Sequence, residues 1–561
     1  MTETRQKKIP IGFDDFGDLI KQDYYYVDKS LFIKELIDQR SYVNLFTRPR
    51  RFGKSLNISM LQYYFDTLFS NDVHVFDGLK ITEAGDHYQS YQNQFPVVKM
   101  TLKGAAGLTF ESAFAKFKTI IAGEFERHSY LLESEKLTTS QKQRYKNIIE
   151  KTASLEDYEG SLRFLSDCLQ LHYNKQVILL IDEYDVPIEK AHAKGFYEEM
   201  VSFIRSFFGE ALKTNPSLFF AVVTGCLRIS KEDIFTGLNN LDVISITANE
   251  YSEYFGFTDL EASNMLSYYG LESKLSQMRD WYNGYLFGET TVYNPWSAIK
   301  YLSDARSGKR YPRAHWANTS SNYIVRQLID IADSTTKAEI EHLIVGGTIT
   351  KPIKEDIIYA EITNSMDNLW NFLFFTGYLK KVEEEQREEK IYYELKIPNR
   401  EVRYIYIRHI SEWLEEKTKV TDLSTLYQAI ITGDTEKFGE QMSMFLMEVI
   451  SFMDSAENFY HGFLGGILRS MDSYIIKSNR ESGDGRSDYF ILPNYIKKQA
   501  FIIEVKIADT MAELEKTCDE ALKQIEDKNY TAELALEGYT NVTKYGLAFF
   551  KKTCMIKMGD K

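Results

Sequence analysis

The sequence lacks the features of a secreted, membrane-spanning or disulfide-stabilised protein. Its four cysteines are scattered at Cys168, Cys226, Cys518 and Cys554, and no two have CxxC spacing. This scatter indicates neither a zinc site nor a disulfide framework. Residues 1–10 are polar and basic, and no apolar run approaches the about 20 residues of a membrane helix. We therefore expect a cytoplasmic protein without membrane contact.

Long disordered linkers and a positive charge are also missing. The chain has only 10 prolines among 561 residues and no repetitive Ser/Gly-rich stretch, so it should fold throughout. The net charge of −14 counts against a general nucleic-acid coat protein, which needs a broadly basic surface. It does not exclude a nuclease, because only the binding groove must be basic. The length exceeds what one hydrophobic core organises, so several domains are expected.

The most informative motif present is Gly53-Lys54-Ser55, between a strand-like run at 42–46 and a helix-competent run at 56–65. Backbone N–H groups around Gly53 can hold phosphate oxygens, Lys54 can reach the terminal phosphates, and the Ser55 hydroxyl can ligate Mg²⁺. The full phosphate-loop pattern has a glycine where this chain has Arg48. The alternative is an ordinary loop entering a helix, with Lys54 and Ser55 merely solvated.

A second motif supplies the acids that a nucleoside triphosphatase needs. Five aliphatic residues at 177–181 precede Asp182 and Glu183, the pattern of a central parallel strand buried on both faces. Asp182 would hold Mg²⁺ through water or Ser55, and Glu183 would polarise the attacking water. The alternative is a buried strand that ends in solvated acids.

A third strand is predicted at 218–225, and its polar end fits the same site. Thr224 could sense the γ-phosphate, and Arg228 could neutralise charge in the transition state, in cis or across a subunit interface. A surface salt bridge is an equally good interpretation of Arg228. Strands that alternate with helices over residues 1–250 predict a parallel sheet covered by helices on both faces.

The middle of the chain has a different character. Residues 133–159 are highly charged and predict an exposed helical insertion, and 256–279 predict the start of a helical lid. An amphipathic helix at 368–377 precedes strands at 378–382 and 391–395 around an acidic turn at 383–390. This outline is winged-helix-like. Because the turn carries mainly glutamate, we favour a packing module over a duplex-binding one.

The C-terminal part holds a second catalytic candidate. Asp488 begins one predicted strand, and Glu504 and Lys506 lie on the next, two residues apart and thus on one face. An antiparallel pair would bring both carboxylates together to bind Mg²⁺. The metal would lower the pKa of a bound water, and Lys506 would position it. The alternative is a small α/β domain in which the acids are surface charges.

Seven segments resemble the predicted AAA-ATPase-like family of bacterial proteins that carry a C-terminal PD-(D/E)XK nuclease domain. They are Tyr26–Lys29, Arg48–Ser55, Ile181–Pro187, Thr224–Ile229, Tyr293–Ser297, Trp316–Ser320 and Ile397–Val402. Arg48 looks usual for this family, and with Arg50 and Arg51 it would form a positive collar before the phosphate site. The resemblance also implies that Glu457 is a further metal ligand and that Gln524 and Lys528 contact phosphate or water. His461 is interpreted as structural.

These patterns lead to one set of expectations. The fold class is α/β: an AAA-like P-loop ATPase domain at 1–250, a helical lid and winged-helix-like region at 251–415, and a restriction-endonuclease-like domain at 416–561. The expected nucleotide site comprises Arg51, Phe52, Gly53, Lys54, Ser55, Leu56, Asp182, Glu183, Thr224 and Arg228. The expected nuclease site comprises Glu457, Asp488, Glu504 and Lys506.

The expected function is ATP binding and hydrolysis coupled to a metal-dependent nuclease, with ATP and Mg²⁺ as cofactors. The expected partner is DNA, with RNA as the alternative, in defence or mobile-element control, and the chain could form a homo-oligomer. Two alternatives stay open. One is an ATP-switched signalling or scaffold protein that binds nucleic acid or protein without cutting, and the other is ATP binding with negligible turnover.

Overall fold

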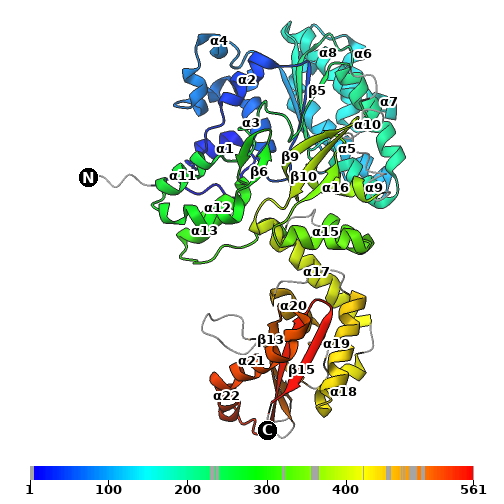
Figure 1. Ribbon diagram of the computed structural model, residues 1–561. Coiled ribbons are helices and arrows are strands. Elements are labelled where there is room, and N and C mark those ends of the chain that lie inside the picture. Colours follow the sequence, from blue (N-terminus) through cyan, green and yellow to red (C-terminus); the bar gives the residue numbers. More distant parts are fainter. Residues whose placement is uncertain are drawn as a thin grey trace, which may run out of the picture. The chain divides into compact units, whose positions relative to one another are not determined.

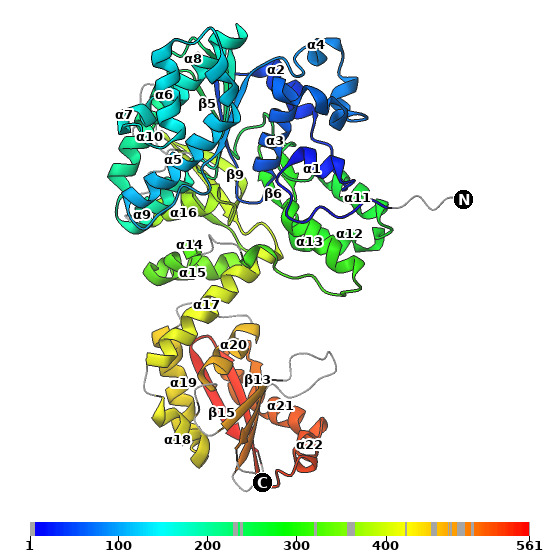
Figure 2. The same cartoon turned by 180° about the vertical axis from the view of Figure 1, so that it is seen from behind.

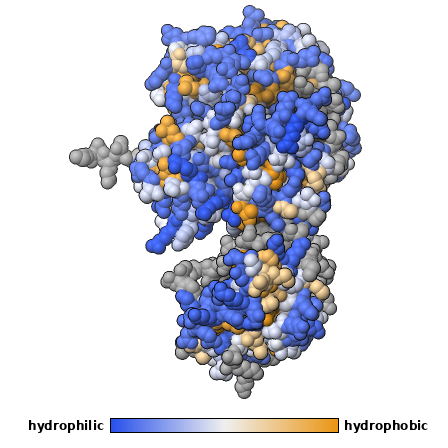
Figure 3. All heavy atoms as spheres, in the orientation of Figure 1, coloured by the Kyte–Doolittle hydropathy of each residue, from blue (hydrophilic) through white to orange (hydrophobic). Residues whose placement is uncertain are grey.

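The computed structural model comprises two compact units, shown in Figure 1. It describes residues 6–227, 234–235, 239–318, 323–355, 365–420, 423–449, 457–468, 471, 474–478, 489–494 and 499–559. The first unit contains Met1–Thr319 and Thr350–Val402, and the second contains Ser320–Ile349 and Arg403–Lys561. Within the described ranges, no helix is long and apolar enough to cross a membrane. The face drawn in Figure 3 is mostly hydrophilic, with apolar residues in small groups.

A five-stranded parallel sheet forms the centre of the first unit, in the order β2-β3-β4-β1-β5. Its strands are β1 (Val43–Thr47), β2 (Val97–Thr101), β3 (Val177–Asp182), β4 (Leu218–Gly225) and β5 (Leu241–Ile244). All of β1 and β3 is buried, as expected for parallel strands covered on both faces. The strands predicted at 42–46, 177–182 and 218–225 are therefore confirmed, and β4 separates β1 from β3.

Helices cover both faces of this sheet, with α2 and α3 on one side and α8 and α10 on the other (Figures 1 and 2). The predicted insertion at 133–159 is helical. The helices up to residue 212 are α1 (Phe16–Lys21), α2 (Leu31–Gln39), α3 (Lys54–Phe65), α4 (Asp86–Gln89), α5 (Phe110–Arg127), α6 (Thr139–Ile149), α7 (Leu155–Glu159), α8 (Ser161–Tyr173), α9 (Val186–Lys194) and α10 (Tyr197–Leu212).

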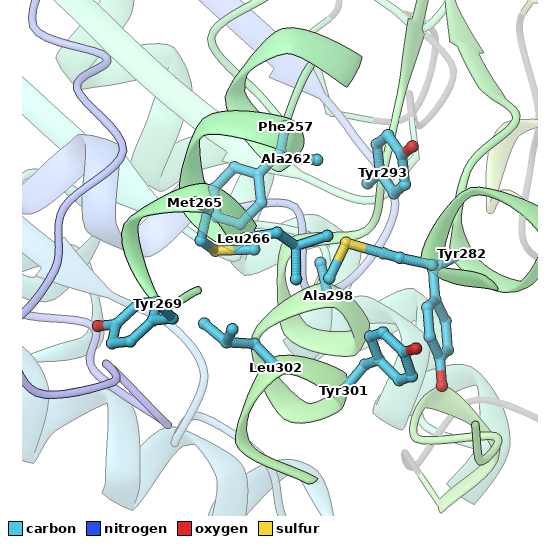
Figure 4. Close-up of a cluster of buried hydrophobic side chains, with 11 residues drawn as sticks. Phe257, Ala262, Met265, Leu266, Tyr269, Tyr282, Tyr293, Ala298, Tyr301 and Leu302 are labelled. Atoms are coloured by element: carbon cyan, nitrogen blue, oxygen red, sulfur yellow. The ribbon is translucent and has the colours of Figure 1, made fainter. Parts of the chain in front are cut away.

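Three further helices, α11 (Asp259–Tyr268), α12 (Leu275–Tyr282) and α13 (Pro295–Arg306), enclose a separate hydrophobic cluster. Figure 4 shows its buried side chains pointing toward one another. Its tyrosines keep their rings inside and their hydroxyls bonded, since Tyr293 donates to Asp259 (2.7 Å) and Tyr301 donates to Gln277 (2.6 Å). The helical region predicted from residue 256 is confirmed. A short hairpin of β6 (Tyr285–Phe287) and β7 (Thr290–Val292) lies between α12 and α13.

The helix and hairpin predicted near residue 380 exist, with two corrections. The helix is α16 (Met366–Phe375), but residues 369–375 are all buried, so it is not amphipathic. Its one polar residue in that run, Asn371, satisfies its amide with the Pro352 carbonyl and the Lys354 N–H. The acidic stretch is not a long turn, because it belongs to strand β9.

The hairpin consists of β9 (Lys380–Arg387) and β10 (Lys390–Lys396), joined by the two-residue turn Glu388–Glu389. Together with β8 (Ile349–Pro352) they form a sheet in the order β8-β10-β9. Most of β9 is exposed, and an edge strand open to solvent tolerates consecutive charged residues. The sequence suggested a turn there because polarity alone does not distinguish a solvated edge strand from a loop.

Helix α17 (Arg400–Val420) begins in the first unit with a buried carboxyl group. Glu401 has no exposed surface, and one of its carboxyl oxygens accepts the Trp316 N–H at 2.8 Å. Burial raises the pKa of Glu401 to about 7, because a buried carboxylate loses hydration.

The elevated pKa of Glu401 predicts a pH-dependent stability. The folded protein binds the Glu401 proton more tightly than the unfolded chain does, so stability is lost as pH rises through the window between the ordinary glutamate pKa and about 7. The loss should amount to roughly 3 kcal/mol. Glu401→Gln should therefore stabilise the protein at about pH 8 but not at about pH 5, measured by denaturant unfolding. A stability difference that is the same at both pH values would contradict this assignment, and Glu126→Gln serves as the exposed control.

The second unit is built on a five-stranded sheet in the order β11-β12-β13-β14-β15. All neighbours are antiparallel except β13 and β14, which run parallel. The strands are β11 (Tyr474–Ser478), β12 (Tyr489–Pro493), β13 (Ala500–Ile507), β14 (Val542–Phe550) and β15 (Thr553–Met558). The predicted antiparallel pairing of the strand after Asp488 with the strand of Glu504 is confirmed.

Alternate residues of β12 and β13 face two groups of helices. Phe490, Leu492 and Ile502 pack with Ile525 of α21 and Tyr530 of α22. Most of α17 belongs to this unit. Its other helices are α14 (Tyr323–Ile331), α15 (Ser334–Ile344), α18 (Ser424–Thr432), α19 (Thr435–Val449), α20 (Glu457–Leu468), α21 (Leu514–Asp527) and α22 (Tyr530–Leu536).

Candidate functional site

The loop between β1 and α3 contains two residues in the left-handed backbone conformation. Arg51 and Gly53 both have positive φ angles, of 71° and 83°, and Gly53 precedes the first residue of α3. This left-handed conformation costs little for glycine but strains an arginine. The N–H groups of the first turn of α3 have no intrahelical partners, so the end of the loop can accept an anion.

The Lys54 side chain is folded back into this loop. Its ammonium donates to the carbonyls of Arg48 (2.8 Å) and Pro49 (2.9 Å), and it lies 3.7 Å from the Cys226 sulfur. Lys54 is buried, with 6 % of its surface exposed. The Arg48 and Pro49 carbonyls therefore hold the Lys54 ammonium inside the loop.

Asp182 joins the three strands expected to build the site. The Ser55 hydroxyl donates to one of its carboxylate oxygens at 2.6 Å, and the Thr224 hydroxyl donates to the other. Asp182 is only 4 % exposed. Three predicted residues, far apart in sequence, therefore converge at the carboxyl ends of β1, β3 and β4.

Glu183 follows Asp182 at the same edge of the sheet. Its φ of 56° is left-handed, which directs the chain away from the axis of β3. Burial and then the neighbouring charge of Asp182 raise the pKa of Glu183. A raised carboxyl pKa is typical of a general base or acid near neutral pH.

Arg48 does not belong to the positive collar expected from the sequence. Its guanidinium is fully buried, lies over the rings of Phe255 (5.2 Å) and Phe287 (5.1 Å), and donates to the Ile244 carbonyl at the end of β5 (2.7 Å). Burial lowers the pKa of Arg48 to about 9. The side chain thus packs beneath the loop, where aromatic faces stabilise a buried cation.

This packing predicts that placing the glycine of the full phosphate-loop pattern at position 48 would destabilise the protein. Arg48→Gly removes a fully buried side chain and leaves a cavity between Phe255 and Phe287. The expected result is a loss of about 2–5 kcal/mol in the free energy of unfolding, the range for large-to-small core substitutions. Denaturant unfolding measures this loss of stability. Arg205→Gly, at an exposed position on α10, is the control for replacing an arginine that is not buried. Unchanged stability in Arg48→Gly would contradict the packing role.

The other loop residues contact elements that follow β5 in sequence. Arg51 is exposed and lies over the ring of Trp296 (4.5 Å), whereas Phe52 is fully buried against Tyr285 (4.9 Å). Phe52 is therefore placed to hold the loop from below, without access to a ligand through its side chain. Leu56, in the first turn of α3, is half-buried.

Arg50 turns away from the collar as well, because it pairs with Glu189 of α9 at 2.6 Å. The expected collar is therefore reduced to Arg51, which is the only one of the three arginines with an exposed side chain. Arg228 lies outside the described residues, and its role stays a prediction.

Sequence reasoning missed two buried groups beside this site. Asp185 is 1 % exposed and accepts the backbone N–H groups of Cys226 and Leu227. Burial raises the pKa of Asp185 to about 6. The second group is the pair Tyr285 and Phe287, which lines the underside of the loop. Asp185 closes the acidic run 182–185, so the run itself was the available signal, whereas nothing near 285 pointed to the loop.

In the second unit, Glu504 lies on β13 in a largely buried position. It is 3 % exposed, and one of its carboxylate oxygens accepts a hydrogen bond from Gln524 of α21. Ile502, Glu504 and Lys506 alternate onto the face covered by α21. Lys506 is half-buried. The structure thus places Glu504 beside the predicted helix residue Gln524, whereas Lys528 lies at the end of that helix.

The remaining predicted nuclease residues cannot be placed in the same way. Asp488 lies outside the described residues, although the next residue, Tyr489, pairs with Ile503 in the sheet. Glu457 is the first residue of α20, the helix that also contains His461. Among the described residues, no group of three His, Cys, Asp or Glu side chains could hold a metal ion.

The first unit is an α/β domain of P-loop type, and the second contains an α/β module of nuclease-like fold. Residues 10–235 match the family model described as "Predicted AAA-ATPase", and residues 455–559 match that of the PD-(D/E)XK nuclease superfamily. The resemblance inferred from the motifs is therefore confirmed for both parts. The chain carries a predicted AAA-ATPase domain and a PD-(D/E)XK nuclease superfamily domain.

Two known proteins were found to be similar to this chain to different extents. A protein of Azotobacter chroococcum mcd 1, described as an uncharacterized protein in the vnfD 5′ region, is 24% identical over 549 residues, covering 95% of each chain. The solved structure of the Aeropyrum pernix ORC2 protein, in ADPNP and ADP complexes, is 10% identical with a TM-score of 0.26. It covers 68% of this chain and 92% of that one, and this similarity is too low to bear on the fold.

Proposed function

We propose that this protein binds and hydrolyses ATP with Mg²⁺ at the ends of β1, β3 and β4, and that its C-terminal module cleaves DNA in a metal-dependent reaction. The observation that carries the ATPase half is the convergence of Ser55 and Thr224 on Asp182. These three polar side chains come from α3, β3 and β4 and meet beside a left-handed loop, as the residues of a nucleotide site would.

The donor set fits a Mg²⁺–ATP complex. Ser55 and Asp182 offer hydroxyl and carboxylate oxygens, the hard ligands that Mg²⁺ prefers. When bound, the metal ion would neutralise phosphate charge. Lys54 would move from the Arg48 and Pro49 carbonyls to the terminal phosphates, and Glu183 would accept the proton of the attacking water.

The nuclease half is supported by Glu504 and by the family match. Glu504 is held by Gln524 on the sheet face that it shares with Lys506, which would fix its orientation toward a metal ion. In our proposal Asp488 and Glu457 complete the ligand set, with Lys506 positioning the attacking water. The substrate is DNA, with RNA as the second choice, and the setting is defence or mobile-element control in the cytoplasm.

The ATPase domain, the lid with its winged-helix-like region, and the nuclease-like domain are proposed as three functional modules of one chain. ATP binding or hydrolysis would gate or assemble the nuclease, with a homo-oligomer as one arrangement that brings Arg228 to a neighbouring site. Arg51, Phe52, Gly53 and Leu56 would complete the nucleotide-binding loop by shaping its backbone.

One observation favours a second function. Glu504 is buried, and one of its carboxylate oxygens is already bonded to Gln524. An ATP-switched scaffold, whose C-terminal module binds nucleic acid or protein without cutting it, would need no metal ion at Glu504.

The deciding experiment incubates the purified full chain with single- and double-stranded DNA and with RNA, each with and without ATP, in Mg²⁺ or Mn²⁺. ATP-dependent cleavage supports the nuclease function. ATP turnover without any cleavage, together with retention of nucleic acid or protein, supports the scaffold. Absence of ATP binding, measured by calorimetry, would reject the nucleotide site itself.

A further inference from the structure

Two chain segments at the edge of the first unit's sheet are tied together by hydrogen bonds that the proposed ATPase reaction does not use. After β3, the Tyr184 N–H donates to the Thr224 carbonyl (3.0 Å), and the Tyr184 hydroxyl donates to the Leu227 carbonyl (2.7 Å). The Asp185 carboxylate accepts the N–H groups of Cys226 (2.7 Å) and Leu227 (3.1 Å). The consecutive residues Tyr184 and Asp185 thus bind both the end of β4 and the two residues that follow it.

The approach of these segments is very close. A Cβ atom on Gly225 would lie 2.5 Å from the Tyr184 ring and 2.9 Å from an Asp185 carboxylate oxygen. Tyr184 and Asp185 are themselves buried. Only glycine therefore fits at the end of β4, and the position of the segment is fixed by contact as well as by hydrogen bonds.

We propose that Tyr184 and Asp185 are positioning residues that hold the segment Thr224–Leu227 against Asp182, so that it presents Thr224 to the terminal phosphate. The inference rests on the proposed ATPase function and deepens it. Asp185 also fixes the backbone of Cys226 and Leu227, the two residues that follow β4. Neither Tyr184 nor Asp185 needs to touch the nucleotide.

The charge of Asp185 suits this task. A carboxylate that accepts two backbone N–H groups makes charge-assisted hydrogen bonds, which are stronger than bonds between neutral groups. Its burial keeps water from competing for the same N–H groups. The segment 182–185 would then transmit any movement of Asp182 directly to the end of β4.

Cys226 provides a reporter that is independent of ATP. Its backbone N–H is held by Asp185, and its side chain is half-buried, whereas Cys168, Cys518 and Cys554 are buried. Burial raises the pKa of the Cys226 thiol to about 11, so alkylation of the native protein should be slow. Release of the segment would expose the thiol and speed the reaction.

The first test measures the iodoacetamide labelling rate of Cys226 in the full chain, located by peptide mass spectrometry. Asp185→Ala and Tyr184→Phe should each speed labelling by about tenfold, the change expected when a hydrogen bond to a charged group or buried carbonyl is lost. Asp185→Asn, which keeps one acceptor oxygen, should fall between Asp185→Ala and wild type. Labelling rates equal to wild type in Asp185→Ala and Tyr184→Phe would overturn the proposal.

Matched controls separate this effect from general loosening. Tyr145→Phe removes a buried hydroxyl that donates to the Phe125 carbonyl, and Asp434→Ala removes an aspartate that accepts the Lys437 N–H. Both should label at the wild-type rate. If either control labels as fast as Asp185→Ala, the segment is not specifically held by Asp185, and the proposal fails.

The second test compares ATP turnover. Asp185→Ala and Tyr184→Phe should lower kcat by about tenfold with KM changed less than about twofold, because the loop that binds the phosphates is left intact. A raised KM with an unchanged kcat would contradict a positioning role. Wild-type protein without ATP turnover would reject the proposed ATPase instead, and the labelling rates would still decide whether Tyr184 and Asp185 hold the segment.

Discussion

Glu183→Gln is expected to bind ATP as tightly as the wild type but to hydrolyse it at least about a hundredfold more slowly, because a general base contributes 10²–10⁴-fold. Glutamine preserves the size of the side chain but cannot accept a proton. The raised pKa of Glu183 places its titration nearer to neutral pH than that of an ordinary glutamate. Hydrolysis by the wild type should therefore fall as the pH is lowered and Glu183 becomes protonated.

Steady-state phosphate release measures this rate, and calorimetry measures ATP binding. Glu126→Gln, an exposed position on α5, is the matched control and should hydrolyse ATP like the wild type. Full activity in Glu183→Gln would show that another group activates the water. A protein that binds ATP and turns it over negligibly even as wild type would favour a nucleotide-controlled switch.

Glu504→Gln is expected to abolish metal-dependent cleavage of DNA while ATP hydrolysis continues at the wild-type rate. Removing one carboxylate from a metal site lowers transition-state stabilisation by several kcal/mol, which slows the reaction roughly a thousandfold. Glutamine can keep the hydrogen bond with Gln524, so the fold of the sheet should survive. The same result is expected for Asp488→Asn if that residue shares the metal.

The loss of DNA cleavage is measured in gel-based assays at varied Mg²⁺ and Mn²⁺ concentrations. Glu513→Gln is the control, because Glu513 is an exposed residue of the same unit that precedes α21. Cleavage that persists in Glu504→Gln would assign any nuclease activity to a different site. Simultaneous loss of ATP turnover would indicate instead that the variant is misfolded or that the two activities are inseparable.

The central strands were predictable from the sequence because their burial leaves a strong pattern. The five aliphatic residues before Asp182 are typical of a strand covered on both faces, and β3 is buried throughout. The same reasoning located Glu504 on β13. Parallel strands also bring their carboxyl ends to one edge. The meeting of Ser55, Asp182 and Thr224 followed because Asp182 and Thr224 lie at strand ends and Ser55 follows the loop after β1.

Features that depend on tertiary packing were not predictable. An arginine before a phosphate loop suggests a surface charge, and only the positions of Phe255 and Phe287, more than 200 residues away in sequence, show that Arg48 is buried. Asp185 was passed over for a similar reason, because its partners are backbone N–H groups without a side-chain signature. The strand β9 was mistaken for a turn since its glutamates are solvated on both faces.

Each unit is built from two separate chain segments, which limits how the protein can be divided into folded fragments. The boundaries fall at 319/320, 349/350 and 402/403, so a single cut cannot separate one unit from the other. A fragment that starts at residue 403 would lack α14 and α15, and with them the contact of Lys337 with the Trp413 ring (5.5 Å). A self-contained nuclease-like fragment would require residues 320–349 to be joined to residue 403 by a designed linker.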